Sequence, residues 1–181
     1  MRVLLSLCAI VLLAACNPDK QKEVDQTTIS FDTNDASKLF FKNMRQSYYD
    51  QQIMEEAKLE LYRFSKRNTD NETPVINLTI VNNWRYDQAY LLLEPGAGMS
   101  LSDLKISWTN SELGESGEIV FENGNKETIV RFADQIYYQL QRGSQFKVML
   151  EDGEVDILKT SQDREAFRIT MVDYYRLVQR L

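Results

Sequence analysis

The sequence has 181 residues and carries 21 Lys and Arg against 27 Asp and Glu, a formal net charge of −6. It contains no histidine and only two cysteines. Without histidine, Ser-His-Asp and Cys-His catalysis are excluded, as are the usual zinc, copper and haem sites. A mildly acidic chain without a basic cluster is also a poor match for nucleic acid. Carboxylate chemistry, an oxygen-ligated Ca²⁺ site and a Ser-Lys arrangement remain possible, although the sequence has no EF-hand spacing. We assign no metal site and no cofactor, and we expect no nucleic-acid partner.

The N-terminal residues have the composition of an export signal. Arg2 is followed by an almost wholly apolar run, residues 3–15, that ends in small residues. Such a run is typical of a secretory signal peptide, and it is shorter than the roughly 20 residues that span a bilayer. The sequence predicts that residues 1–15 are a signal peptide that is removed. The alternative is a buried N-terminal helix.

The end of this run carries a short motif, Leu13-Ala14-Ala15-Cys16. It resembles the lipobox of bacterial lipoproteins. The resemblance implies cleavage before Cys16, a diacylglyceryl group on its sulfur and an acylated amino terminus. Asn17 follows instead of Asp, which in that family favours delivery to the outer membrane, facing the periplasm or the cell surface. More than one acyl chain makes such an anchor stable, so the membrane contact is expected to be the anchor alone.

The chain after the signal peptide divides into a tether and a body. Residues 16–34 are mostly polar and include Pro18, so we predict a lipidated cysteine followed by a flexible tether. Residues 35–181 suit a single domain that buries its core without disulfides.

The first half of the body mixes two hydrophobic periods. Between residues 36 and 56 the apolar positions fit neither a helix nor a strand. Residues 57–65 alternate and predict a strand. Residues 76–81 and 89–93 predict two further strands, which the polar and aromatic residues 82–87 connect as a hairpin.

The second half alternates strands and helices. Residues 105–108 and 118–121 predict a strand pair. Apolar residues at helical spacing from Ile129 to Leu140 then predict an amphipathic helix, with Asn125 as its N-cap and Gly143 just past its end.

The last part of the chain predicts a hairpin and a helix. Asp152-Gly153 between two alternating runs is a strong hairpin signal. Ser161 can cap a final helix whose apolar stripe runs from Phe167 to Leu181. Together these elements predict an α+β fold, mainly an antiparallel sheet of short strands with two amphipathic helices in the C-terminal half.

Two further resemblances concern the body. It resembles small uncharacterised bacterial lipoproteins, which implies no activity. From about Lys105 onward, the predicted order strand-strand-helix-strand-strand-helix is similar to that of the invasion-associated locus B family of exported β-rich proteins. The cysteine pair of that family is missing here, and no functional residue can be matched.

The connection within the first hairpin is the strongest candidate binding patch. Trp84 and Tyr86 can stack on a sugar or a peptide, while Arg85 and Asp87 can supply hydrogen bonds. The alternative is an ordinary hairpin turn, with the aromatic side chains folded onto the sheet and Arg85 paired to Asp87.

Three further patterns have plain explanations. Ser102 and Lys105 match a bare S-x-x-K motif, but Lys105 enters a predicted strand rather than following Ser102 on a helix. Exposed acidic pairs at turns, such as Glu151-Asp152, are expected to be solvated, so no catalytic residue is assigned. The chain also carries three tyrosine pairs. We expect one member of each to face the core and the other to flank it, with a shared aromatic groove as the alternative; the pairs are Tyr48-Tyr49, Tyr137-Tyr138 and Tyr174-Tyr175.

These observations predict a lipid-anchored envelope protein that is not catalytic and that binds or scaffolds another envelope protein or a glycan. One alternative is a carboxylate-dependent hydrolase acting on glycans or peptidoglycan, which would need two buried carboxylates facing each other in a cleft. The other is a small-ligand carrier, which would need an enclosed apolar cavity between sheet and helices.

Overall fold

The computed structural model describes residue 24 and residues 28–70, 72–96, 98–122 and 124–181. Its strands are β1 (Tyr49–Met54), β2 (Leu59–Phe64), β3 (Ile76–Asn83), β4 (Gln88–Pro95), β5 (Lys105–Asn110), β6 (Glu115–Val120), β7 (Gln145–Leu150) and β8 (Gly153–Ile157). Its helical elements are α2 (Asp35–Phe40), the π-helical turn η1 (Phe41–Arg45), the 3₁₀ turns η2 (Gln46–Tyr48) and η3 (Leu101–Asp103), α3 (Lys126–Gln141) and α4 (Ser161–Leu177).

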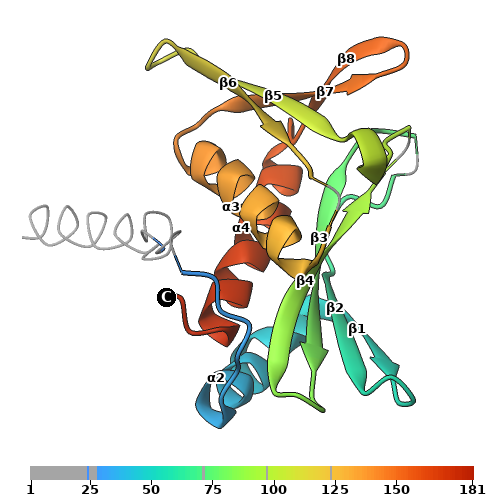
Figure 1. The fold of residues 1–181 in the computed structure, drawn as a ribbon, viewed down its shortest axis with the longest axis vertical. Coiled ribbons are helices and arrows are strands. Elements are labelled where there is room, and N and C mark those ends of the chain that lie inside the picture. The colour runs from blue at the N-terminus through green and yellow to red at the C-terminus, as the bar shows by residue number, and fades with distance from the viewer. Residues whose placement is uncertain (1–23, 25–27, 71, 97, 123) are drawn as a thin grey trace, which may run out of the picture.

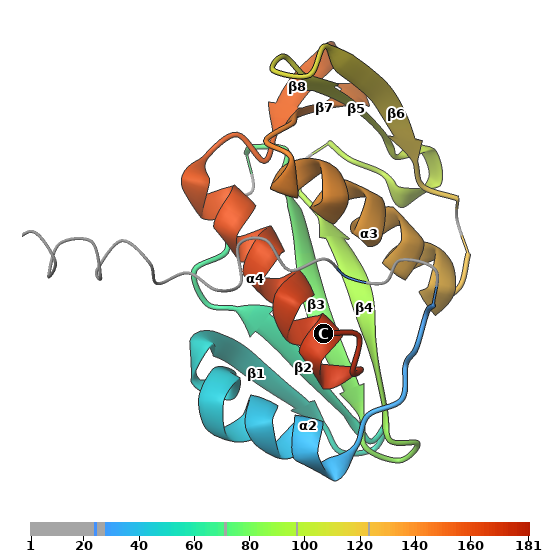
Figure 2. The same ribbon diagram turned by 90° about the vertical axis from the view of Figure 1, so that its left-hand side faces the viewer.

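The strands form two antiparallel sheets of four, in the orders β1-β2-β3-β4 and β6-β5-β7-β8. Helices α3 and α4 pack against each other and across one face of the first sheet, on β3 and β4 (Figure 2). The second sheet lies over one end of this helix pair (Figure 1). The expected α+β class is confirmed.

The face of the first sheet that the helices cover forms the main core. Tyr62, Ile80 and Leu91 lie side by side on β2, β3 and β4, and all three are buried. Burying a large apolar side chain of this kind contributes roughly 1.5–3 kcal/mol. The alternation that predicted β3 and β4 is thus the pattern of their contact with α3 and α4. Tyr62 of β2 lies on the same face of the sheet but packs against Phe41 of η1. The hairpin of β3 and β4 is confirmed.

Helix α3 follows its sequence signals closely. The side chain of Asn125 accepts hydrogen bonds from the backbone N–H groups of Glu127 and Thr128, at 2.9 and 3.3 Å. These bonds satisfy N–H groups that have no partner inside the helix. Gly143 has a φ of 82° just beyond the helix end, a conformation that glycine adopts at little cost.

Two details of helix α4 differ from expectation. Its N-cap is Thr160, one residue before Ser161. Thr160 and Asp163 form a reciprocal capping box, whereas the residue three positions after Ser161 is Arg164, which cannot accept a hydrogen bond from the backbone. The helix also ends at Leu177, so Leu181 lies beyond it and is partly exposed.

The ambiguous stretch after residue 35 holds a helical segment followed directly by a strand. Asn34 and Ser37 cap α2 reciprocally, and the helix passes through η1 and η2 into β1. Phe41 is the buried residue of η1 and packs edge-on against Tyr62, with ring centroids 4.9 Å apart. No single hydrophobic period fits this stretch because a helical segment and a β-strand, whose hydrophobic periods differ, follow each other within it.

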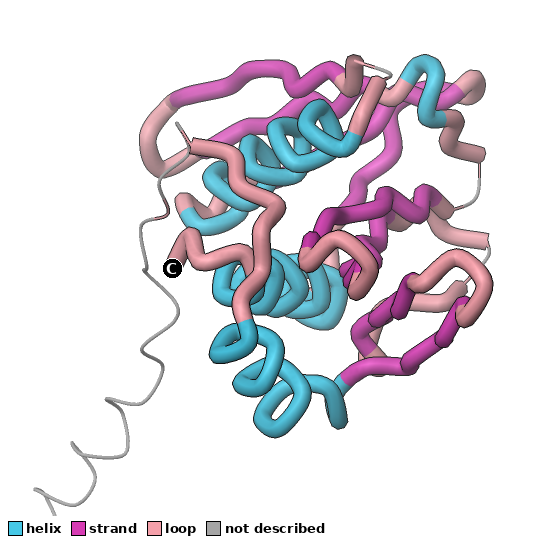
Figure 3. Tube along the Cα trace, turned by 60° about the horizontal axis from the view of Figure 1, so that its bottom comes forward, coloured by secondary structure: helices cyan, strands magenta, loops and turns pink. Residues whose placement is uncertain are grey.

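The described residues of the expected tether lie against the body. Residues 28–34, here called the N-terminal strap, run along the outer edge of β4 (Figure 2) and lead into α2 (Figures 2 and 3). The N–H of Ala89 donates to the carbonyl of Phe31, and the N–H of Thr33 donates to that of Asp87, both at 2.8 Å. Ile29 and Phe31 pack against the core.

The signal peptide and the lipobox with Cys16 lie outside the described residues. Among the helices that the structure does describe, none has the length and apolar character needed to cross a membrane.

Candidate functional site

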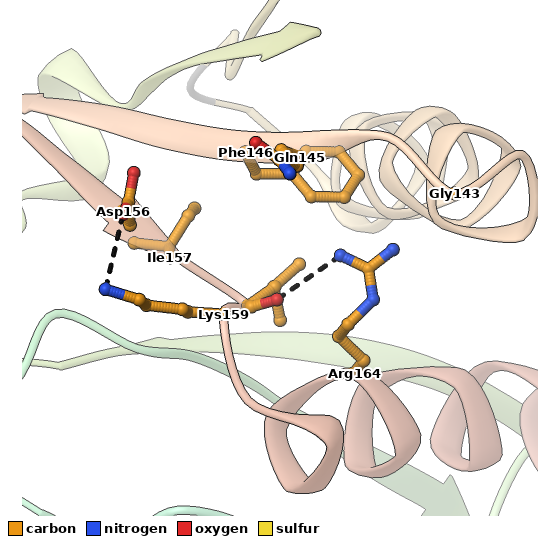
Figure 4. Close-up of a pocket in the computed structure, with 8 residues that line it drawn as sticks. Gly143, Gln145, Phe146, Asp156, Ile157, Lys159 and Arg164 are labelled. Carbon is orange, nitrogen blue, oxygen red and sulfur yellow. Dashed lines mark hydrogen bonds and ion pairs between the residues drawn. The ribbon is translucent and has the colours of Figure 1, made fainter. Parts of the chain in front are cut away.

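One cleft lies between the β7–β8 hairpin and the start of α4, and has a volume of about 390 Å³. Two cations line it, and one of them, Lys159, pairs with Asp156 at 3.5 Å. The other is Arg164, which Figure 4 shows reaching toward the chain between β8 and α4. The guanidinium donates to the carbonyls of Ser144, Leu158 and Leu140 at 3.0–3.4 Å. Burial lowers the pKa of Arg164. These donors join three segments of the chain, so the arginine of this cleft serves the fold.

A second cleft, of about 430 Å³, lies between α2 and the end of the first sheet. Its polar atoms bind mainly one another. Glu60 accepts hydrogen bonds from the Tyr62 hydroxyl at 2.8 Å and from Asn82 Nδ2 at 2.9 Å, and Gln46 donates to Gln51 at 2.8 Å. Burial, with Glu60 adding to it, raises the pKa of Tyr62 well above its ordinary value.

The largest of these concave surfaces, about 690 Å³, lies between η1, η2, β2 and the first half of α4; we call it the arginine groove. It combines apolar, cationic and small polar side chains from segments far apart in the sequence. Its lining residues are Arg45, Tyr48, Phe64, Ser65, Lys66, Arg67, Ser161, Gln162, Glu165 and Ile169.

Arg45 is held in place by a buried carboxylate. Its Nε lies 2.8 and 3.0 Å from the two carboxylate oxygens of Asp173 on α4. The Asp173 side chain is 1% exposed, whereas that of Arg45 is 23% exposed. The Tyr49 hydroxyl donates to the same carboxylate at 2.7 Å. Burial raises the pKa of the Asp173 carboxyl, and the bonds from Tyr49 and Arg45 oppose that rise.

Arg45 also lines the groove. Within the described part of the chain, no hydrogen bond or ion pair engages its terminal nitrogens Nη1 and Nη2. The guanidinium carbon lies 4.7 Å from the centroid of the Tyr48 ring, a cation–π arrangement. Tyr48 is 47% exposed. The groove therefore presents a fixed guanidinium fork beside an open aromatic ring.

The loop after β2 forms the opposite rim of the groove. Gln162 Nε2 donates to the backbone carbonyl of Lys66 at 3.0 Å, which joins this loop to α4. Arg67 pairs with Asp50 at 2.6 Å. Lys66 is exposed and makes no side-chain ion pair with any residue that the structure describes.

A second buried carboxylate has partners of the same types. Asp134 on α3 accepts from the Tyr175 hydroxyl at 2.7 Å and pairs with Arg180 Nη2 at 3.0 Å. Both side chains of this ion pair are almost fully buried, at 6% and 3% exposed. Burial raises the pKa of Asp134, which the bonds from Tyr175 and Arg180 oppose. Each buried aspartate thus accepts from one tyrosine and lies close to one arginine, and Asp173 also pairs with Arg176 at 3.8 Å.

The residues proposed from the sequence as a binding patch lie on the turn between β3 and β4. Tyr86 is 63% exposed, and the Arg85 guanidinium lies 5.4 Å from its ring centroid. Trp84 is half-buried. Asp87 pairs with Lys38 of α2 at 2.7 Å, rather than with Arg85. None of the three concave surfaces described above includes these four residues.

Two of the three tyrosine pairs have one buried and one exposed member, as expected. Tyr48 and Tyr138 are exposed while their neighbours Tyr49 and Tyr137 are buried. The expectation is wrong for the third pair, because Tyr174 and Tyr175 are both fully buried. Helix α4 is enclosed by α3, the first sheet and the N-terminal strap, so its buried surface is wider than one stripe.

Sequence reasoning missed Arg45 and Asp173 because charged residues are normally solvated. One signal was present for the aspartate. Asp173 lies four residues after Ile169 and four before Leu177, in phase with apolar neighbours on one side of α4. Nothing comparable marks Arg45.

No group of three or more His, Cys, Asp and Glu that could hold a metal ion occurs among the residues that the structure describes. Comparisons with family models, with curated proteins and with solved structures give no match.

Proposed function

We propose that this chain is a lipid-anchored envelope protein, held in the outer membrane through Cys16, whose body is a non-catalytic binding module. The arginine groove is its binding surface. Through it the protein binds another component of the envelope, a protein or a glycan.

The observation that carries this proposal is the way in which Arg45 is held at the groove. Its Nε is bound to a buried carboxylate, while the residue lines a groove of about 690 Å³ and its Nη1 and Nη2 nitrogens have no partner among the described residues. Ligand sites are typically concavities of this size in which a few fixed polar groups stand among apolar side chains. An arginine that is oriented before a ligand arrives loses less conformational entropy on binding.

The two buried carboxylates also favour binding over hydrolysis. A hydrolase of the kind considered above uses two carboxyl groups that flank one bond of the substrate. Asp134 and Asp173 lie in separate clusters instead, each with its own tyrosine and its own arginine partners. This arrangement orients cationic side chains.

Photo-crosslinking in intact cells tests the binding surface. Benzoylphenylalanine in place of Tyr48 should yield a defined crosslinked species upon irradiation. Tyr138 provides a matched control, because it is also 47% exposed and lies outside the groove. Equal crosslinking patterns from the two positions, or only the protein itself recovered at Tyr48, would contradict the proposal.

Cell fractionation tests the anchor separately. Cys16→Ala should release the protein from membranes because no sulfur remains to carry the lipid. Membrane fractionation that is unchanged in this variant would rule out anchoring at Cys16, whatever the groove binds.

A further inference from the structure

We propose that the arginine groove recognises an amphiphilic carboxylate, that is, a carboxylate group joined to an apolar or aromatic body, as at the carboxyl end of a peptide. The inference rests on the proposed binding function and specifies the ligand of the same site.

The geometry of Arg45 selects an oxyanion. Asp173 is bound through Nε, so the Nη1 and Nη2 nitrogens remain as a planar pair of donors on an arginine that lines the groove. Such a pair matches the two oxygens of a carboxylate in a bidentate arrangement. Because Asp173 is itself held by Tyr49, the fork is fixed before the ligand binds.

The charges around the groove favour a single negative charge. Asp173 pairs with Arg45 and also, at 3.8 Å, with Arg176, which does not line the groove. Asp50 pairs with Arg67, and Glu165 pairs with Arg168 at 2.7 Å. Among the lining residues that the structure describes, Lys66 is the cation left without an acidic partner. One uncompensated cation suits a monoanionic carboxylate better than a dianionic phosphate, which would leave a second charge poorly balanced.

The rest of the groove suits an apolar body. Tyr48, Phe64 and Ile169 contribute aromatic and aliphatic surface beside the fork. A carboxylate alone would occupy a small part of the 690 Å³ volume. An attached aromatic or aliphatic group would cover the exposed Tyr48 ring and remove apolar surface from water.

Calorimetry with matched probes tests this inference on the full chain in detergent micelles. N-acetylphenylalanine carries the carboxylate and an aromatic body, and its uncharged amide carries only the body. For a ligand of this size we expect a dissociation constant on the order of 1 mM. The amide should bind at least about tenfold more weakly, since it cannot form the charge-assisted pair.

Variants of Arg45 distinguish the contribution of its paired Nη donors from that of its positive charge. Arg45→Lys keeps a cation opposite Asp173 but has no fork, and should weaken N-acetylphenylalanine binding about tenfold. Arg131→Lys is the matched control, because Arg131 is an exposed residue of α3 outside the groove; binding should be unchanged. Near-UV circular dichroism reports whether each variant keeps its fold. If Arg45→Lys does not fold, Tyr48→Ala still tests the site, with a several-fold loss expected.

Several outcomes would overturn the inference. Equal affinity for the acid and the amide would show that the carboxylate is not recognised. Tighter binding of inorganic phosphate, or Arg45-dependent binding to phosphatidylglycerol vesicles, would assign the fork to a phosphate instead. Failure of N-acetylphenylalanine to bind, or to compete with crosslinking at Tyr48, would reject the ligand class. Crosslinking that is specific to Tyr48 would then still support the binding function, whereas its absence would reject both.

Discussion

The two buried aspartates show how one chemical arrangement can serve two purposes. Asp134 and Asp173 each lie on a long helix, accept a tyrosine hydroxyl at 2.7 Å and pair with an arginine. Arg180 directs its terminal nitrogens at Asp134 and is itself buried. Arg45 uses Nε and remains partly exposed. The difference teaches that the outer face of the arginine, and not the buried carboxylate, decides whether such a cluster can meet a ligand.

Replacing each buried aspartate by alanine should reveal the largest difference in stability between the two clusters. Asp134→Ala removes the carboxylate that pairs with the buried side chain of Arg180, a change that typically costs about 3–5 kcal/mol. Asp173→Ala should cost less, about 1–3 kcal/mol, because Arg45 can turn toward solvent. Urea denaturation at pH 7 measures both free energies of unfolding. A larger loss for Asp173→Ala would show that Arg45 is as dependent on its carboxylate as Arg180.

Removing each tyrosine hydroxyl should have a smaller and more even effect. Tyr175→Phe and Tyr49→Phe each delete one hydrogen bond to a carboxylate that keeps its arginine. We expect a loss of about 1–2 kcal/mol for each, measured by thermal and urea unfolding. No loss for Tyr49→Phe would mean that its hydroxyl does not help to position Asp173.

The pH dependence of stability should sharpen the comparison. Burial raises the folded-state pKa of both Asp134 and Asp173 above the ordinary value of 3.8. At pH values between the ordinary pKa and the raised pKa, the folded state binds more protons than the unfolded state. The contribution of these two carboxyl groups to stability therefore grows as the pH falls through that range. The wild type should therefore lose less stability between pH 7 and pH 4 than the Asp134→Asn/Asp173→Asn variant. Parallel curves would contradict the raised pKa values.

Changes on the open side of the groove should have the smallest effect on stability. Tyr48→Ala and Lys66→Gln remove exposed side chains, so the free energy of unfolding should change by no more than about 0.5 kcal/mol. Differential scanning calorimetry measures this. A large destabilisation by Tyr48→Ala would assign the ring to the fold rather than to a binding surface.

Local signals predicted most of the individual elements. Asn125 and Gly143 mark the ends of α3 in the sequence because capping depends on neighbouring residues alone. Asp152-Gly153 marks the hairpin of β7 and β8, where Gly153 has a φ of 120°. Each of these features is determined within a few residues of the chain.

Contacts between distant segments could not be predicted in the same way. Arg45 and Asp173 are far apart in the sequence, and α4 brings them together only after it packs on the first sheet. The burial of both Tyr174 and Tyr175 likewise depends on elements that enclose α4 from several sides. The candidate groove is made of such contacts, and so no local pattern marks it.

The N-terminal strap bears on how a shortened chain would behave in solution. β4 is the last strand of its sheet, and the strap hydrogen-bonds to Asp87 and Ala89 at its outer edge. An uncovered strand edge is a template for pairing with other molecules. A chain beginning at Asp35 would therefore be more prone to aggregation than one beginning at Thr28, although it contains every helix and strand of the described fold.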